Sequence, residues 1–206
     1  MYGHLGRHKR IARCLDWGSD FIDLGYESCG DLESYLKKVQ VSGRVRCRMA
    51  RQAVEAVVFI HSKNVIHSDL SARQYLLGKG RNNVRLSDFG GSSLQGSEAL
   101  VMKNATHFLP RDEELPNSVQ SDLFALGSTL YEIFLGRRPY EGVQDEEVQR
   151  LYSAKEFPAL SEIAYPQWRI VIQKCWTCEY KHASDILNDI ASVSCVSRLF
   201  KSLAYG

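Results

Sequence analysis

Two aspartates stand in polar segments that each follow a short apolar run. In residues 64–77, NVIHSDLSARQYLL, Asp69 lies between the apolar pair Val65-Ile66 and the apolar run Tyr75-Leu76-Leu77. Further along the chain Asp88 follows a second apolar run in VRLSDFGG, where the glycines permit a sharp turn. Each aspartate alone is typical of a turn or a helix cap. Together they suit phosphoryl transfer, because one carboxylate can accept a proton from an attacking hydroxyl and the other can hold Mg²⁺.

The segments that must position these aspartates have the length and pattern of short strands. Strands are expected at 65–66, 75–77 and 84–86, and a hairpin is expected where the runs 11–17 and 21–26 flank Gly18-Ser19-Asp20. Since strands come early and helical patterns dominate later, the sequence predicts an α+β fold with a mainly helical body.

Helices are predicted mainly from apolar periodicity. From Ser42 to His61 apolar residues recur every three or four positions, which indicates an amphipathic helix. From Ser121 to Phe134 they lie on nearly every side, which indicates a helix buried in the middle of the domain and ended by Gly136. Further expectations are a helix N-capped by Asp31, helices at 146–154, 166–175 and 184–193, and an exposed, mobile loop between Gly90 and Leu109.

Composition limits the classes of function. The chain has 206 residues and a net charge of +2, which gives no strong bias toward nucleic acid or an anionic membrane. No apolar run approaches the roughly 18 residues that span a bilayer. The six cysteines are scattered, which favours reduced thiols in a soluble, cytoplasmic protein. Cys175, Cys178 and His182 imitate a metal site, but without a second ligand pair core cysteines are the better interpretation.

Several ordered motifs resemble the eukaryotic protein kinase family. HSDLSARQ resembles the catalytic loop H-R-D-L-x-x-x-N, and D-F-G is intact. SDLFALGSTLYEIFLGRRPY resembles the segment that opens the central buried helix of the large lobe, and VIQKCWTCEYKHASDILNDI resembles the last two helices. The resemblance covers nearly the whole chain. It implies a protein-kinase-like fold with a mainly helical C-lobe and remnant strands of the N-lobe.

The resemblance also implies chemical roles. Asp69 would be the catalytic base, and Arg73 matches the catalytic-loop arrangement of tyrosine kinases and their close relatives. Asp88 would be the main Mg²⁺ ligand, and Gln74 stands where the family has a metal-binding Asn. The implied cofactors are ATP and Mg²⁺, and the implied partner is a protein substrate or a binding protein.

Other positions would support the nucleotide and the loops. The segment Leu24 to Ser28, with Tyr26 at its centre, resembles the hinge that receives adenine, and Leu76 would pack beneath the ring. Four further residues would have structural roles, in the column that aligns the lobes, in the D-F-G turn and at the start of the buried helix: His67, Phe89, Gly90 and Asp122.

The chain also departs from the family pattern. Ser68 replaces an Arg that usually pairs with a phosphorylated activation loop, and Arg111 replaces a Glu. The longer Gln74 moves its amide by about 1.5 Å relative to Asn, and a misplacement of that size can cost 100-fold in rate. The chain contains no G-x-G-x-x-G loop, no V-A-x-K lysine and no helix carrying the partner Glu.

These departures leave three alternatives. The first is a kinase domain divided into residues 1–28 (remnant small lobe and hinge), 29–198 (large lobe) and 199–206 (tail), truncated and impaired. The second is an inactive pseudokinase that acts as a protein-binding scaffold. The third is a small-molecule phosphotransferase of the aminoglycoside or choline kinase type, which the Asp122 helix argues against. In the first case an apolar face is expected to be uncovered near Ile11, Leu15 and Phe21.

Overall fold

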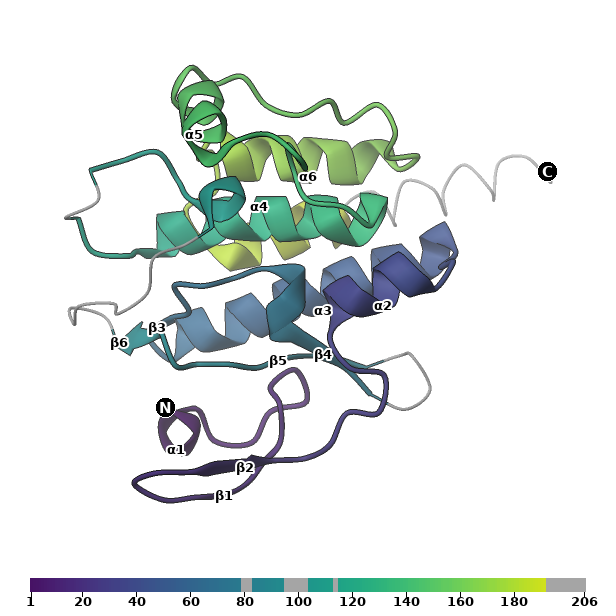
Figure 1. Cartoon of the computed structure of the whole chain (residues 1–206). Helices are drawn as coiled ribbons and strands as arrows, with labels where there is room; N and C mark the ends of the chain where they lie inside the picture. The colour runs from purple at the N-terminus through teal and green to yellow at the C-terminus, as the bar shows by residue number, and fades with distance from the viewer. Residues whose placement is uncertain (79–82, 95–103, 113–114, 192–206) are drawn as a thin grey trace, which may run out of the picture.

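The computed structural model describes residues 1–78, 83–94, 104–112 and 115–191 (Figure 1). Its elements in chain order are α1 (Tyr2–Leu5), β1 (Cys14–Trp17), β2 (Ile22–Leu24), α2 (Leu32–Lys38), α3 (Gly43–Ser62), β3 (Val65–Ile66), η1 (Ala72–Gln74), β4 (Tyr75–Leu77), β5 (Val84–Leu86), β6 (Ser93–Leu94), η2 (Ala105–His107), α4 (Val119–Leu135), α5 (Asp145–Ser153) and α6 (Pro166–Trp176). Residues 183–191 are also helical. Among all the described residues, no helix has the length and apolar character needed to cross a bilayer.

The strands form three separate antiparallel pairs, β1–β2, β3–β6 and β4–β5. Helices make up most of the remainder, so the predicted α+β class with a helical body is confirmed. In β4–β5, Tyr75 pairs with Leu86 and Leu77 pairs with Val84. All four side chains are buried, so this small sheet fixes the loop between β3 and β4 against the core.

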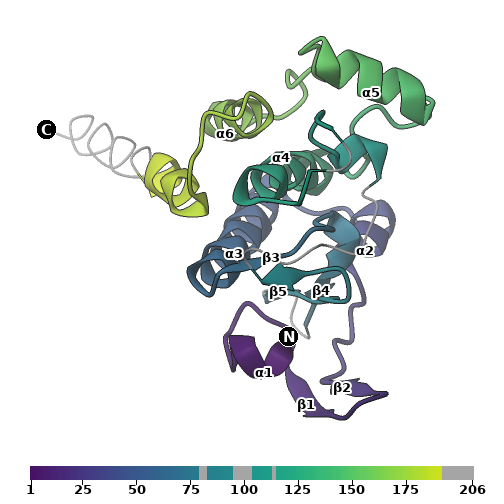
Figure 2. The same ribbon diagram turned by 90° about the vertical axis from the view of Figure 1, so that its left-hand side faces the viewer.

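Helix α4 is the centre of the molecule, as predicted. Every residue from Ser121 to Phe134 is buried, and the helix packs against α3 and α6 (Figure 2). The Ser118 hydroxyl accepts from the Ser121 amide at the start, and Gly136 ends the helix in the left-handed region at φ 73°. Gly127 lets α6 approach closely, because a Cβ there would lie 2.7 Å from the Cβ of Cys175.

The other predicted helices also form, but the loop expected between Gly90 and Leu109 was predicted wrongly in its described parts. β6 pairs with β3, and all three residues of η2 are buried. The backbone is held there because the Ser128 hydroxyl donates to the Thr106 carbonyl at 2.7 Å and the Tyr152 hydroxyl donates to it at 3.2 Å. Residues 95–103 lie outside the described part of the chain.

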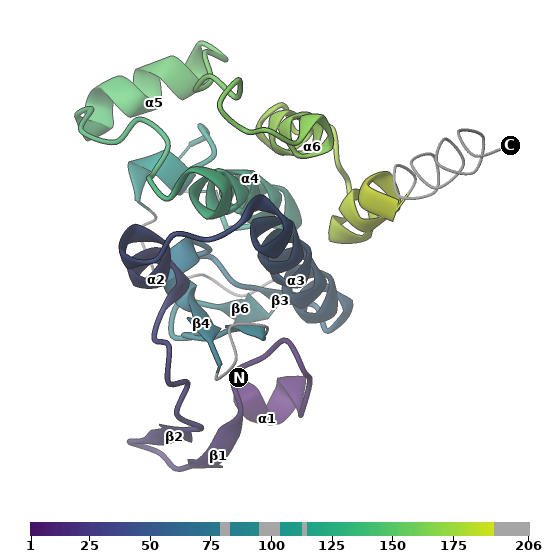
Figure 3. The ribbon, with the colours of Figure 1, turned by 90° about the vertical axis from the view of Figure 1, so that its right-hand side faces the viewer.

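The β1–β2 hairpin lies at the opposite end of the molecule from α5 and α6 (Figures 1 and 3). Leu15 and Phe21 are 54% and 50% exposed, as expected. The expectation for Ile11 was wrong, since Ile11 is 2% exposed. The reason is a backbone contact: the Leu86 amide donates to the Arg10 carbonyl and the Ala12 amide donates to the Leu86 carbonyl, both at 2.8 Å, which draws Ile11 into the core.

Candidate active site

The loop between β3 and β4 is held by a buried carboxylate at the start of α4. Asp122 is fully buried, and its oxygens accept hydrogen bonds from the His67 amide at 2.7 Å and the Ser68 amide at 3.0 Å. Ser68 has φ 72°, which is unusual for a residue with a side chain. The two hydrogen bonds therefore hold a strained backbone directly before Asp69.

His67 connects the two loops that carry the aspartates. Its Nε2–H donates to the Ser87 carbonyl at 3.0 Å, and its Nδ1 accepts from the Asp69 amide at 3.3 Å. The second bond requires the neutral ring, because Nδ1 can accept only when it carries no proton. Burial lowers the pKa of His67 and outweighs the nearby charge of Asp122, so the neutral ring is the stable form at pH 7.

The side chain of Gln74 lies against Asp69. Asp69 is half-buried, and the Gln74 amide Nε2 donates to its Oδ2 at 2.5 Å. The backbone carbonyl of Gln74 in turn accepts from the amide and hydroxyl of Ser87, at 2.9 and 2.8 Å. Gln74 therefore links the loop to the strand end before Asp88. Arg73, which lies between Asp69 and Gln74 in the sequence, is exposed.

Asp88 is presented to solvent by a turn in the left-handed region, at φ 56°. The Gly90 amide lies 3.5 Å from its Oδ1. Next to it the ring of Phe89 packs between two aromatic rings, with centroids 5.2 Å from Tyr2 and 5.1 Å from His67. Tyr2 was not singled out from the sequence, because α1 is too short to show periodicity.

The metal ligands expected from the sequence are of a chemical type that would suit a magnesium ion brought with a nucleotide. Mg²⁺ prefers oxygen ligands and is usually held by one or two carboxylates, with phosphates and water completing the shell. Asp88 and the amide oxygen of Gln74, the metal ligands expected from the sequence, are oxygen ligands of that kind. Over the described ranges no three His, Cys, Asp or Glu residues cluster in a way that could hold a metal, and Cys175, Cys178 and His182 are not such a group.

The segment directly after the expected hinge runs beside β4. The Cys29 amide donates to the Leu77 carbonyl at 3.1 Å, and the Leu77 amide donates to the Gly30 carbonyl at 2.9 Å. Leu24 and Leu76 are both half-buried, whereas Tyr26 is 90% exposed, so its ring makes little contact with the rest of the chain. Glu27, which lies in the expected hinge, pairs with Arg85 of β5.

Sequence reasoning missed Glu132, which also supports the loop. It is 3% exposed, and its Oε2 accepts from the Ala72 amide at 2.7 Å. The sequence did contain a signal for Glu132: it is an acidic residue in a helix predicted to be buried, and a buried glutamate needs a partner.

Comparison with known proteins decides the family. The profile described as "Protein tyrosine and serine/threonine kinase" matches residues 5–188. The chain belongs to the protein kinase family. This kinase domain is 31% identical to Aurora kinase A-A of Xenopus laevis over 175 residues, 80% of this chain and 42% of that protein. It is 32% identical to vascular endothelial growth factor receptor 3 of Mus musculus over 152 residues, 69% of this chain and 11% of the receptor.

A third relative of the kinase domain is serine/threonine-protein kinase A-Raf of Homo sapiens, 30% identical over 128 residues, 56% of this chain and 21% of that protein. The chain therefore spans less than half the length of each of these relatives.

Proposed function

We propose that this kinase domain, once completed by a glycine-rich loop and its lysine, transfers the terminal phosphoryl group of ATP to a hydroxyl group of a protein, with Asp69 and Asp88 as its central residues. The observation that carries the proposal is the double contact of His67, to the Asp69 amide at 3.3 Å and to the Ser87 carbonyl at 3.0 Å. Since Ser87 precedes Asp88, one buried ring fixes both acidic loops at a single site.

Each side chain has a distinct task in this proposal. Asp69 is half-buried and accepts the proton of the substrate hydroxyl. Asp88 is exposed and binds the metal. Mg²⁺, when bound with ATP, neutralises charge on the phosphates. Arg73 is exposed on the same loop and would meet the substrate, and the hinge at Leu24 and Tyr26, with Leu76 of β4, would receive the adenine.

Binding of ATP tests this assignment without requiring turnover. Titration calorimetry on the 206-residue chain is expected to show ATP binding that depends on Mg²⁺ and is weakened at least tenfold by Asp88→Asn. Asp145→Asn, an acid-to-amide change in the first turn of α5, is the matched control and is expected to bind as the wild type does. Equal affinity of all three proteins, with or without Mg²⁺, would reject the assignment.

A second candidate function is a pseudokinase that serves as a scaffold for a partner protein. The contact between Gln74 and Asp69 favours it, because the amide occupies a carboxylate oxygen that a substrate hydroxyl would otherwise approach. Binding of Mg²⁺ and ATP without any phosphoryl transfer, once the glycine-rich loop and lysine are supplied, would select this candidate.

A further inference from the structure

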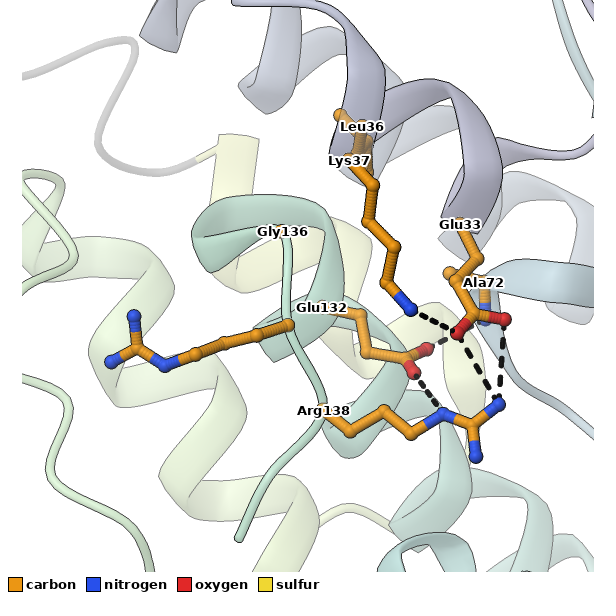
Figure 4. A pocket seen from close by; sticks show the side chains of 8 residues that line it. Glu33, Leu36, Lys37, Ala72, Glu132, Gly136 and Arg138 are labelled. Carbon is orange, nitrogen blue, oxygen red and sulfur yellow. Dashed lines mark hydrogen bonds and ion pairs between the residues drawn. The ribbon is translucent and has the colours of Figure 1, made fainter. Parts of the chain in front are cut away.

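A small pocket lined by five charged side chains lies beside the catalytic loop. It is formed by α2, η1, the C-terminal end of α4 and the residues after it (Figure 4). Glu33 and Lys37 come from α2, Ala72 from η1, Glu132 from α4, and Arg138 from the following turn.

The floor of the pocket is a buried carboxylate with an unused acceptor. Glu132 is 3% exposed, and one oxygen, Oε2, accepts from the Ala72 amide. Within the described ranges the other oxygen, Oε1, has no hydrogen-bond partner. A buried carboxylate oxygen in that state strongly favours a cationic donor.

Arg138 supplies a cation but does not complete the hydrogen bond. Its Nη2 lies 3.3 Å from Glu33 Oε1, and its Nε lies 3.7 Å from Glu132 Oε1, an ion-pair distance that is too long for a hydrogen bond. Lys37 binds Glu33 at 2.9 Å. Partial burial raises the pKa of Glu33, but the hydrogen bond from Lys37 and the charge of Arg138 outweigh it, so the pKa of Glu33 is lowered. Two carboxylates therefore face two cationic side chains, and the Nε2 of the buried His107 also lies 3.3 Å from Glu132 Oε2.

The space left over is too small for a second cationic side chain. With Arg138 in place a cavity of about 10 Å³ remains, which is room for about one water molecule. An arginine or lysine side chain from another protein therefore does not fit, because the volume is too small and the carboxylates already have cationic partners. Removing the guanidinium of Arg138 would leave the two carboxylates facing Lys37 and the His107 ring, and would open the volume that the guanidinium fills.

The pocket is close enough to Asp69 to contact a bound substrate. Ala72 is three residues from Asp69, so their Cα atoms are at most about 11 Å apart. An extended peptide advances about 3.3 Å per residue. A substrate side chain at the pocket would therefore lie within about three residues of the hydroxyl at Asp69.

We propose that Arg138 is a built-in occupant of a cation-binding pocket and thereby a specificity-determining residue. It closes the site formed by Glu33 and Glu132 to arginine and lysine side chains near the acceptor hydroxyl of a protein substrate. The role in substrate selection rests on the proposed function, whereas the occupancy of the pocket by Arg138 does not.

The test uses ethylguanidinium as a substitute for the missing side chain in Arg138→Ala. The melting temperature of Arg138→Ala is expected to rise by several degrees in millimolar ethylguanidinium, because a ligand that binds the folded state stabilises it. Arg137→Ala is the matched control: it removes the same charge from the neighbouring position, which also lines the pocket but whose guanidinium pairs with Glu162 at the surface. Wild type and Arg137→Ala are expected to show no such rise.

A second variant separates the pocket from general effects of the salt. The double variant Arg138→Ala/Glu132→Gln is expected to lose the response, since the buried charge is gone. If Arg138→Ala does not fold, Arg138→Met keeps the apolar stem and is tested in the same way. An equal response of wild type, Arg137→Ala and the Arg138 variant would overturn the proposal. The readout needs neither ATP nor transfer, so failure of the proposed function would leave this result standing.

Discussion

His67 gives the stability of the molecule a predictable dependence on pH. Burial lowers its pKa from 6.5, so below about pH 6.5 the unfolded chain takes up a proton that the folded chain does not. Its contribution is therefore complete above that pH and is lost as the pH falls. The free energy of unfolding is expected to decrease by up to about 1.4 kcal/mol per pH unit from this group.

Urea denaturation at pH 7, 6 and 5 measures this effect. His67→Gln keeps an N–H donor toward the Ser87 carbonyl but does not titrate, so its unfolding free energy is expected to fall less steeply than that of the wild type. Parallel curves for the two proteins would show that His67 is not held neutral by the fold.

Gln74 is expected to be a poorer metal-site residue than asparagine. The shorter side chain of Gln74→Asn cannot reach Asp69 as Gln74 does, so its amide oxygen becomes available to the ion and Asp69 loses a donor. The Mg²⁺ concentration needed for half-maximal ATP binding is expected to fall, on the order of tenfold. Calorimetry at a series of Mg²⁺ concentrations measures it, with Gln149→Asn on α5 as the control. An unchanged or higher requirement would mean that the loop has adapted to glutamine.

Among the elements, α4 shows most clearly how packing limits the sequence. Gly127→Ala raises helix propensity by about 1 kcal/mol. The new Cβ, however, would lie 2.7 Å from Cys175 Cβ and 3.2 Å from Trp176 Cδ1, and overpacking of a core costs about 1–3 kcal/mol. The variant is therefore expected to have a lower free energy of unfolding than the wild type.

Chemical denaturation decides this balance. Gly3→Ala in α1 is the control, because its Cβ would meet Trp17 at 3.6 Å, an ordinary contact, and no loss of stability is expected. A Gly127→Ala protein that is more stable than the wild type would show that α4 and α6 can move apart without cost.

The elements also show which parts of the fold could be predicted from the sequence. Helix α4 and the separate strands β4 and β5 were predictable, because periodicity and short apolar runs are local signals. The burial of η2 was not, since it depends on hydroxyl groups of Ser128 and Tyr152 that come later in the chain. The same reason applies at the site: the aspartates stand in recognisable motifs, whereas the contact of Arg138 with Glu33 joins residues far apart in sequence.

At the scale of the whole molecule, the hairpin is the least supported part. A two-stranded sheet is marginal by itself, and Trp17 and Ile22 on β1–β2 are 61% and 57% exposed. Trp17→Lys is expected to reduce self-association at high concentration without lowering the melting temperature, as measured by light scattering. Ile170→Lys, at a 48% exposed position on α6, is expected to have less effect. A wild-type chain that is already monodisperse at all concentrations would contradict this prediction.

The most direct test of the central claim compares phosphoryl transfer by two proteins. The 206-residue chain lacks the glycine-rich loop and the lysine that align the phosphates, and little or no transfer to a protein is expected from it. The same chain fused behind the small lobe of a relative such as Aurora kinase A-A is expected to transfer phosphate from ATP to protein hydroxyl groups. Asp69→Asn is expected to lower that rate by about 10²–10⁴-fold. A fused protein that binds Mg²⁺ and ATP yet transfers no faster than its Asp69→Asn variant would contradict the account.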